Sequence, residues 1–383
     1  MTHLKLPVSI AVAAALSAAL LSACAKRGAE EPQSADGVAP PSEERALNLY
    51  IWNDYLAPDT LANFEKETGV KVSVSNYGSN EELDAKLAPG HSGYDVVVPS
   101  ASSFERQIKA GYYQKLDKSL LPNLKNMDPE IQRRLALHDP DNAYAVLHMW
   151  GTTGIGYNAK KIKAAMSDAP ADSWRLAFDP KVAMRFKDCG VAVLDSATEM
   201  FSMMLAYLGK DPNSQNAEDL AAAGDALMAM RPAIRYIDTQ RMISDLAAGD
   251  ICLAVGYNGD LLQARTRAQE MQSGQEIVYV VPKEGTLIWF DGYLIPADAP
   301  HIQSAHAFIN YMLRPEVIAA VTNAVHYANG NSAAKQFVEP AVRNDAGVYP
   351  PADVMTKLTP DLADTEETTR IMTRLWQRFI TGK

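Results

Sequence analysis

The sequence predicts an α/β protein folded as two lobes. Short apolar strands alternate with longer helical patterns, as expected where helices cover the faces of a sheet. The folded body begins near Leu47 and holds about 337 residues, which is more than a single hydrophobic core usually organises. Two lobes or domains are therefore expected.

Residues 1–23 have the features of a lipoprotein signal peptide. Lys5 supplies positive charge, and Val8 to Leu21 is an apolar run too short to span a bilayer comfortably. The run leads into Leu21-Ser22-Ala23-Cys24, which resembles the bacterial lipobox, where the cysteine is lipidated and becomes the mature N-terminus. We predict export and lipidation at Cys24; the alternative is an ordinary signal peptide followed by a chance cysteine.

Residues 24–46 are predicted to be a flexible tether, because Glu, Pro, Ser, Gly and Ala predominate and cannot bury a core. The full chain has a formal net charge of −10. Removing residues 1–23 takes away the charge of Lys5 and no acid, which gives about −11. This charge favours a cationic ligand and disfavours nucleic acid, although acidity also serves solubility alone.

The three cysteines predict one disulfide. With Cys24 used for lipid, Cys189 and Cys252 remain as an even pair in an oxidising compartment. Each lies beside a short apolar run, so two neighbouring strands could bring them together. Two separate buried thiols are the alternative.

The first part of the body reads as strand, helix, strand, strand, helix. Leu47, Leu49 and Ile51 alternate with polar or aromatic residues, and Gly69 ends the first helix. The predicted elements are strands at 47–52, 70–74 and 94–98 and helices at 59–68 and 104–110.

The remainder repeats this pattern. Gly209 ends one helix, an Ala-rich helix follows, and Pro282 ends a strand. Strands are predicted at 191–194, 251–257 and 276–281, and helices at 199–208, 217–230, 241–248, 301–313, 316–325 and 367–380.

Enzyme signatures are sparse. The sequence has no Gly-x-Ser-x-Gly, His-Glu-x-x-His or Walker motif, and its seven histidines lack the spacing of a zinc site. The stretch Gly154 to Ala159 fits a loose dinucleotide-binding pattern, but no clear second strand precedes Asp179. We interpret this stretch as a turn that its glycines permit, and we predict a protein that is not an enzyme and uses neither cofactor nor metal.

Three clusters combine an aromatic residue with an aspartate near the end of a strand-like run: Trp52-Asn53-Asp54-Tyr55, Tyr257-Asn258-Gly259-Asp260 and Trp289-Phe290-Asp291. An aromatic face attracts a cation and a carboxylate pairs with an ammonium, so the clusters suit an organic cation with apolar stretches. Ligands of open α/β sheets bind beyond the carboxyl ends of strands, where the first two clusters and Ser100 lie.

Each acid also has a structural interpretation. Asp260 and Glu199 fall near predicted helix starts, where a carboxylate stabilises free N–H groups, and Asp54 fits a turn before Pro58. Asp291 differs because it interrupts an apolar run, where a buried carboxylate requires a partner. That partner could be a lysine, an arginine or a bound cation.

Several segments resemble the polyamine-binding proteins of ABC importers, closest to the putrescine-binding type. They include Tyr50 to Pro58, Asn63 to Gly69, Asp95 to Ser102, Gly209 to Ser214 and Gly249 to Cys252, and continue with Pro282 to Gly285 and Tyr349 to Val354. The resemblance spans essentially residues 47–383.

The resemblance implies a bilobal periplasmic-binding-protein fold of type II, with a hinge and a ligand cleft between lobe 1 (47–150 and 284–340) and lobe 2 (151–283 and 341–383). It implies a periplasmic monomer that binds a polyamine, putrescine or spermidine, and delivers it to an ABC permease and its ATPase. Carried over by position, the ligand residues are Trp52, Asn53, Asp54, Tyr55, Ser100, Glu199, Tyr257, Asp260, Trp289, Asp291 and Tyr327. The family's disulfide also falls on Cys189 and Cys252.

Three positions depart from the putrescine type. Asn53 replaces a usual serine, Tyr257 a tryptophan and Trp289 a phenylalanine, which changes the aromatic faces and leaves the acids in place. We expect Asp54 to bind one terminal ammonium and Asp260 with Asp291 the other. Two alternative functions remain, a polyamine sensor or adaptor lipoprotein and an exported hydrolase, although no nucleophile and base can be assembled for the hydrolase.

Overall fold

The computed structural model of the chain describes residues 45–383, which belong to one compact unit. The predicted signal peptide, Cys24 and nearly all of the predicted tether lie outside the described residues. The strands are β1 (Ala46–Trp52), β2 (Lys71–Tyr77), β3 (Val96–Val97), β4 (Val146–Asn158), β5 (Val191–Val193), β6 (Ile234–Ile237), β7 (Leu253–Tyr257), β8 (Ile277–Val280), β9 (Thr286–Tyr293), β10 (Ala328–Asn329) and β11 (Leu358–Pro360).

The α-helices cover these strands and include every helix that the sequence predicts, with ends that differ by a few residues. They are α1 (Thr60–Thr68), α2 (Asn80–Leu87), α3 (Ala101–Lys109), α4 (Pro129–Leu135), α5 (Ala159–Ala165), α6 (Arg175–Phe178), α7 (Pro180–Ala183), α8 (Ala197–Tyr207), α9 (Ala217–Met230), α10 (Arg241–Ala248), α11 (Asn258–Glu270), α12 (Ile302–Met312), α13 (Pro315–Val325), α14 (Pro340–Arg343), α15 (Ala352–Met355) and α16 (Glu366–Thr381).

One sheet is parallel and has three strands in the order β2-β1-β3. The alternating Leu47, Leu49 and Ile51 of β1 are buried, as the sequence predicts. The predicted strand at 94–98 is reduced to two residues, and Val97 exchanges backbone hydrogen bonds with Leu294 of the chain that follows β9. The carboxyl end of β1 is Trp52, which therefore lies at the edge where ligands of such sheets bind.

The second sheet has eight strands, with β11-β9-β4-β7-β5-β6 as its path and β8 and β10 also paired with β4. The 13-residue strand β4 pairs with β9 over its first half and with β7 and β8 over its second half. The predicted turn at 154–159 is therefore wrong. Its glycines serve close packing: a Cβ on Gly154 would lie 2.5 Å from the Val280 carbonyl oxygen, and one on Gly156 would lie 2.6 Å from Leu261.

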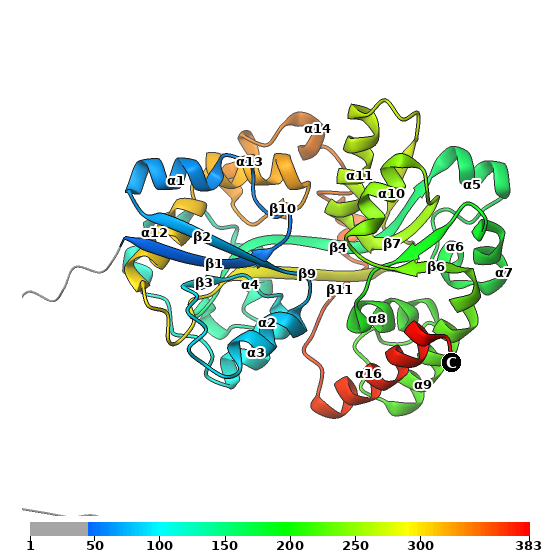
Figure 1. Cartoon of the computed structure of the whole chain (residues 1–383), viewed down its shortest axis with the longest axis horizontal. Coiled ribbons are helices and arrows are strands. Elements are labelled where there is room, and N and C mark those ends of the chain that lie inside the picture. The colour runs from blue at the N-terminus through cyan, green and yellow to red at the C-terminus, as the bar shows by residue number, and fades with distance from the viewer. Residues whose placement is uncertain (1–44) are drawn as a thin grey trace, which may run out of the picture. The chain divides into compact units, whose positions relative to one another are not determined.

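Buried apolar side chains form two cores. The first includes Leu47, Phe64 and Phe308, and the second includes Trp174 and Phe201. Strand β4 contributes its first half to the first core and its second half to the second, and Figure 1 shows β4 and β9 running between the two groups of helices. The chain therefore crosses from one core to the other along hydrogen-bonded strands.

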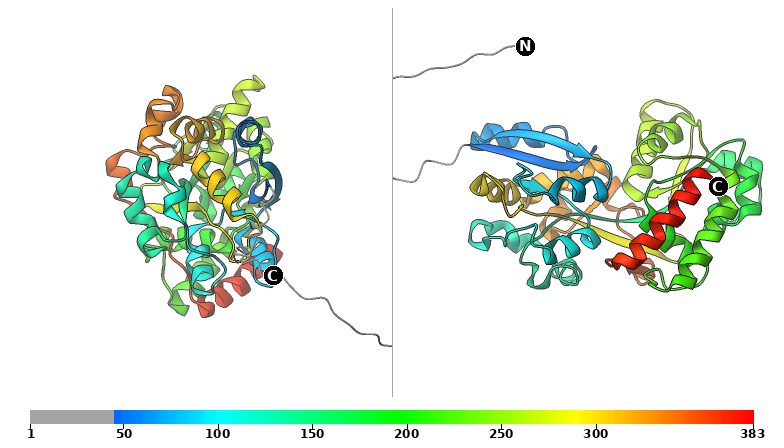
Figure 2. Two further views of the ribbon diagram at one scale, coloured as in Figure 1. Left: turned by 90° about the vertical axis from the view of Figure 1, so that its left-hand side faces the viewer. Right: turned by 60° about the horizontal axis from the view of Figure 1, so that its bottom comes forward.

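The predicted disulfide is confirmed between Cys189 and Cys252, whose Cα atoms are 5.5 Å apart. Cys252 immediately precedes β7 and Cys189 lies two residues before β5, and these two strands are parallel neighbours that pair from Val191 and Leu253 onward. The bridge therefore ties two strands of the second core. The C-terminal helix α16 packs on the same core and lies along α9 (Figure 2).

Among residues 45–383, no helix has the length and hydrophobicity needed to cross a membrane. Within the same range, no group of three or more His, Cys, Asp or Glu residues could hold a metal ion.

Candidate functional site

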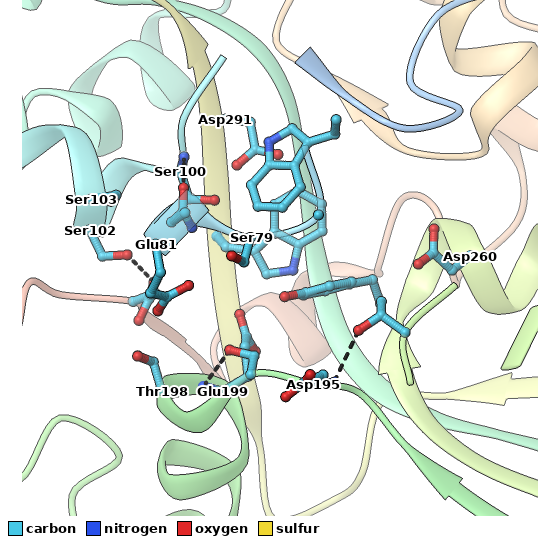
Figure 3. A pocket seen from close by; sticks show the side chains of 18 of the residues that line it. Ser79, Glu81, Ser100, Ser102, Ser103, Asp195, Thr198, Glu199, Asp260 and Asp291 are labelled. Carbon is cyan, nitrogen blue, oxygen red and sulfur yellow. Dashed lines mark hydrogen bonds between the residues drawn. The ribbon is translucent and has the colours of Figure 1, made fainter. Parts of the chain in front are cut away.

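A cavity of about 140 Å³ contains all eleven predicted ligand residues on its wall. They come from the segment after β1, the start of α3, the starts of α8 and α11, strand β9 and the segment before β10. They are Trp52, Asn53, Asp54, Tyr55, Ser100, Glu199, Tyr257, Asp260, Trp289, Asp291 and Tyr327. Figure 3 shows Asp260 on one side of this cavity, Ser102 on the other, and Glu199 and Asp291 between them.

Strand ends place the first side chains. Trp52 is the last residue of β1, and its Nε1 donates to the Val98 carbonyl oxygen at 2.8 Å. Tyr257 ends β7, so Asp260 falls in the first turn of the helix that follows. Ser100 forms an isolated antiparallel bridge with Asp291, which brings β9 against the start of α3.

Asp291 is the buried acid that the sequence marks as needing a partner. Its side chain belongs to β9, the residue is 5% exposed, and the Tyr55 hydroxyl donates to its Oδ2 at 2.8 Å. Its Oδ1 has no hydrogen-bond partner of good geometry among the described residues. Burial raises the pKa of Asp291 to about 7, although the hydroxyls of Ser100 and Tyr55 lower it. No lysine or arginine of the described chain forms an ion pair with Asp291.

Asp260 forms a second acidic position. The Tyr327 hydroxyl donates to its Oδ1 at 2.8 Å. The pKa of Asp260 is raised to about 6, chiefly by burial and also by the charge of Asp54, while the Tyr327 hydrogen bond and Arg267 act to lower it. Asp54 is exposed and lies 3.7 Å from the Arg267 guanidinium. Asp54 therefore adds to the negative potential at Asp260, and the expected division of the acids between two ammonium groups stays a prediction.

Glu199 is not used as a helix cap. Ser196 caps α8 by accepting from the Glu199 backbone N–H, and the Glu199 carboxylate instead accepts from the Thr153 hydroxyl at 2.7 Å. Burial raises the pKa of Glu199, and the neighbouring carboxylates of Asp361 and Asp291 raise it further. Glu199 thus belongs to an acidic group in the cavity.

Aromatic rings form a continuous series along the cavity. Tyr257 meets Trp289 edge-to-face with ring centroids 5.6 Å apart, and Trp289 meets Tyr327 in the same way at 5.2 Å. Tyr327 in turn meets Tyr55 at 5.4 Å. Such rings hold one another in place and present apolar surface and negative faces to a ligand.

Sequence reasoning missed several cavity residues, above all Asp361 and Asp364. Asp361 directly follows β11, and the Ser102 hydroxyl donates to its Oδ2 at 2.5 Å. Asp364 lies three residues further along the chain and also lines the cavity. The signal that could have revealed Asp361 is the one used for Asp54, an acid just beyond a short strand, but Leu358–Pro360 is too short to be recognised as a strand.

The cavity wall is strongly acidic. It carries one guanidinium, that of Arg106, and eight carboxyl groups: Asp54, Glu81, Asp195, Glu199, Asp260, Asp291, Asp361 and Asp364. Buried carboxyl groups repel one another unless protons or cations neutralise them. The arrangement is suited to holding a multiply charged organic cation along an aromatic wall.

Two curated proteins are similar to this chain over nearly its whole length. The putrescine-binding periplasmic protein PotF of Escherichia coli strain K12 is 48% identical over 344 residues, covering 89% of this chain and 93% of that protein. The putrescine-binding periplasmic protein SpuD of Pseudomonas aeruginosa strain UCBPP-PA14 is 48% identical over 353 residues, covering 91% and 96% respectively.

Two solved structures share the fold. The spermidine/putrescine ABC transporter substrate-binding protein PotD of Streptococcus pneumoniae gives a TM-score of 0.72 at 27% identity, covering 88% of this chain and 99% of the other. The TpPotD lipoprotein of Treponema pallidum gives a TM-score of 0.74 at 25% identity, covering 87% and 99%. The fold predicted from the sequence, an α/β periplasmic-binding-protein fold of type II, is confirmed.

The family model described as bacterial extracellular solute-binding protein matches residues 59–350, which include the starts of α3, α8 and α11 and the whole of β9. With that match and with relatives 48% identical over most of its length, the chain belongs to the bacterial extracellular solute-binding protein family.

Proposed function

We propose that this chain binds a linear polyamine in the acidic cavity and delivers it to an ABC importer, and that it has no enzymatic activity. The observation that carries the proposal is a cavity wall with eight carboxyl groups, one guanidinium and a series of aromatic rings. Relatives named for binding putrescine or spermidine support it.

The two acidic positions suit ammonium groups joined by an apolar chain. One ammonium lies against Asp260, with Asp54 adding negative potential, and a second lies against Asp291 and Glu199. Trp289, between Tyr257 and Tyr327, packs on the methylenes that separate the charges. The remaining predicted residues, Trp52, Asn53, Tyr55 and Ser100, close the wall around the ligand.

The energies of these contacts are sufficient for tight binding. Four buried methylenes contribute about 3 kcal/mol at roughly 0.8 kcal/mol each. Each charge-assisted hydrogen bond contributes about 1.5–3 kcal/mol before the costs of ordering and desolvation. Micromolar affinity needs only about 8 kcal/mol.

We propose that two lobes close on the ligand about the strands β4 and β9. Gly151 pairs with Trp289 at the point where β4 passes between the two cores, so a bend there moves a cavity residue. Lobe 1 comprises 47–150 and 284–340 and lobe 2 comprises 151–283 and 341–383. We change one of these boundaries: Val342, Val348 and Leu358 pack in the first core, which favours a last passage of the chain from lobe 1 to lobe 2 after β11 and not at residue 341. Small-angle scattering should show a smaller radius of gyration with polyamine, and an unchanged radius would count against closure.

Delivery requires the protein to stay near the membrane. We propose a periplasmic monomer, held by lipid on Cys24 through the tether 24–46, that passes its ligand to a permease and its ATPase. The similar Treponema pallidum protein is named a lipoprotein. Mass spectrometry of the mature N-terminus tests the anchor, because a lipid-modified Cys24 supports it and an unmodified N-terminus contradicts it.

Titration calorimetry with putrescine, spermidine and arginine tests the binding function. We expect saturable binding of the linear polyamines with a stoichiometry near one, and weak or no binding of arginine, whose α-carboxylate would meet the acidic wall. Absence of heat with every polyamine contradicts the proposal. Loss of polyamine uptake on deletion of the gene, restored by the wild-type chain, separates transport from a sensor role.

A further inference from the structure

His148 is a fully buried histidine of β4 that contacts the segment after β1 and does not line the ligand cavity. Its Nε2 lies 3.2 Å from the backbone carbonyl oxygen of Tyr55, and its Nδ1 lies 2.6 Å from the hydroxyl oxygen of Tyr293 in β9. A carbonyl oxygen can only accept, so Nε2 carries the hydrogen and Nδ1 accepts from Tyr293. These two hydrogen bonds fix one tautomer of the ring.

The ring of His148 is neutral. Burial lowers its pKa to about 3, although the hydrogen bond to Tyr55 acts to raise it. Burial also raises the pKa of Tyr293 well above its usual value, so the Tyr293 hydroxyl keeps the proton that it donates. His148 therefore acts on its neighbours as a fixed donor and acceptor and not as a charge.

A β-bulge determines where the His148 side chain points. In the pairing of the two central strands, Leu147 of β4 lies opposite Gly292 of β9. The next residues in register are Met149 and Asp291, so β4 contributes one extra residue at this point, which is His148. Such a bulge redirects a side chain out of the regular alternation and is common beside functional sites. The extra residue thus lies next to the strand partner of a cavity acid.

The segment that holds Tyr55 depends on contacts with the rest of the protein. Within residues 45–383, the backbone N–H and C=O groups of residues 53–56 form one hydrogen bond of good geometry, the bond that the Tyr55 carbonyl accepts from His148. Asp54 has a left-handed backbone with φ of 50°, a conformation that costs energy in a residue other than glycine. His148 therefore supplies the main backbone attachment of this segment.

The position of Tyr55 affects both acidic positions of the cavity. The His148 ring meets the Tyr55 ring edge-to-face, with ring centroids 4.8 Å apart. The Tyr55 hydroxyl donates to Asp291, and the Tyr55 ring meets that of Tyr327. The Tyr327 hydroxyl in turn donates to Asp260. A shift of Tyr55 would therefore disturb the partners of both buried aspartates.

We propose that His148 is a positioning residue for polyamine binding, because its Nε2–H holds Tyr55 and Tyr55 aligns the acids that receive the ammonium groups. This inference rests on the proposed function. Tyr293 fixes the tautomer in which Nε2 can donate. Neither His148 nor Tyr293 lines the cavity, so their effect on affinity is indirect.

Calorimetric titration with putrescine and spermidine at pH 7.5 tests this role in the full protein. The variant His148→Phe keeps a ring but removes both hydrogen bonds, and we expect it to bind each amine about fivefold more weakly than the wild type. The matched control is His306→Phe. His306 is a buried histidine of α12 whose two nitrogens are hydrogen-bonded to backbone groups, and it does not line the cavity. The control should keep the wild-type affinity even where it lowers the melting temperature.

A second pair of variants covers the case in which His148→Phe does not fold. Tyr293→Phe removes only the hydroxyl that fixes the tautomer, and it should weaken binding about twofold. Its matched control is Tyr113→Phe, because Tyr113 is 5% exposed and its hydroxyl donates to Gln107 at 2.6 Å away from the cavity. This control should bind as the wild type does.

Two further readouts separate positioning from a purely structural role. Nitrogen NMR of histidine-labelled wild type should show a His148 ring protonated on Nε2 alone and unchanged between pH 5 and 8. In a Tyr55→Phe background, His148→Phe should cost less affinity than it does in the wild type, because both changes disturb the same bond to Asp291. A purely structural defect would give independent, additive losses.

The positioning role is overturned by wild-type affinity in both His148→Phe and Tyr293→Phe, by additive losses in the double variant, or by a ring protonated on Nδ1. Each of these results leaves polyamine binding itself intact. If the wild type binds neither putrescine nor spermidine, the proposed function fails instead.

Discussion

The hydroxyl of Tyr55 donates to Oδ2 of Asp291 at 2.8 Å across 236 positions of sequence, and so joins the segment after β1 to strand β9 inside the cavity. The other oxygen of Asp291 has no hydrogen-bond partner among residues 45–383. Tyr55 also meets Tyr327 edge-to-face, so the same side chain connects Asp291 to the tyrosine that hydrogen-bonds Asp260.

Replacing Asp291 by asparagine should weaken polyamine binding. The change removes a charge-assisted hydrogen bond and should cost more than about 1 kcal/mol of binding free energy. Tyr55→Phe, which keeps the Asp291 charge but removes the donated hydrogen bond, should have a smaller effect. Calorimetric titration of both variants measures the difference, and unchanged affinity of Asp291→Asn would remove Asp291 from the site.

Polyamine affinity should fall as the pH is lowered from about 8 to 5. In the free protein the pKa values of Asp260 and Asp291 are raised to about 6 and 7, and those of Glu199 and Asp361 are also raised. Protons must therefore leave before an ammonium can pair, whereas alkylammonium groups with a pKa of about 10 stay charged throughout.

Titrations at several pH values measure this dependence. In Asp291→Asn the decrease between pH 8 and 6 should be smaller than in the wild type, because one titrating group is absent. Affinity that is constant across the range, or that rises on acidification, contradicts the assignment of these carboxyls to the ligand.

A methyl group at Gly151 should damage both stability and binding. Its Cβ would lie 2.3 Å from Asn258 Oδ1 and 2.5 Å from the Trp289 ring, so either the backbone of β4 at Gly151 or the Trp289 side chain in the cavity wall must shift. Gly151→Ala should lower the melting temperature and reduce polyamine affinity. Gly224→Ala is the matched control, since the three atoms nearest to its Cβ would all belong to the flexible Leu375 side chain, the first of them 3.1 Å away, and neither residue lines the cavity. If Gly151→Ala keeps the wild-type affinity, the pairing of Gly151 with Trp289 between β4 and β9 does not position the Trp289 side chain.

Loss of the disulfide should lower stability and spare the site. The bridge closes a loop with a sequence separation of 63, for which the chain-entropy model gives about 4 kcal/mol. Neither cysteine lines the cavity. The double variant Cys189→Ser/Cys252→Ser should unfold at lower denaturant concentration yet bind polyamine at 20 °C with near wild-type affinity, as checked by chemical denaturation and calorimetry. Two free thiols in the denatured, non-reduced wild type would refute the pairing.

Residues near the ends of recognisable elements could be placed from the sequence. Trp52 and Tyr257 end strands with clear alternating or apolar patterns, and the cavity forms at the carboxyl ends of those strands as the general rule predicts. The cysteine count predicted the Cys189–Cys252 pair without any geometry. Asp291 was recognisable because an acid inside an apolar strand needs a partner.

Features that depend on tertiary contacts could not be placed in this way. Strand β4 lacks an alternating apolar pattern because both of its faces are buried. In the sequence Gly154 and Gly156 look like the glycines of a turn, but glycine is needed there because neighbouring backbone and side chains leave no room for a Cβ. Asp361 enters the cavity only because β11 pairs with β9 about 70 residues earlier in the chain. Its own segment is polar and contains no aromatic residue to mark a site.

The measurement that tests the central claim most directly is a crystal structure of the protein grown with spermidine. The account predicts density for one linear ligand in the cavity, with ammonium nitrogens within hydrogen-bond distance of Asp260 and of the Glu199 and Asp291 pair, and its methylenes against Trp289. An empty cavity in a crystal soaked at saturating spermidine, or a ligand bound elsewhere on the protein, would contradict it.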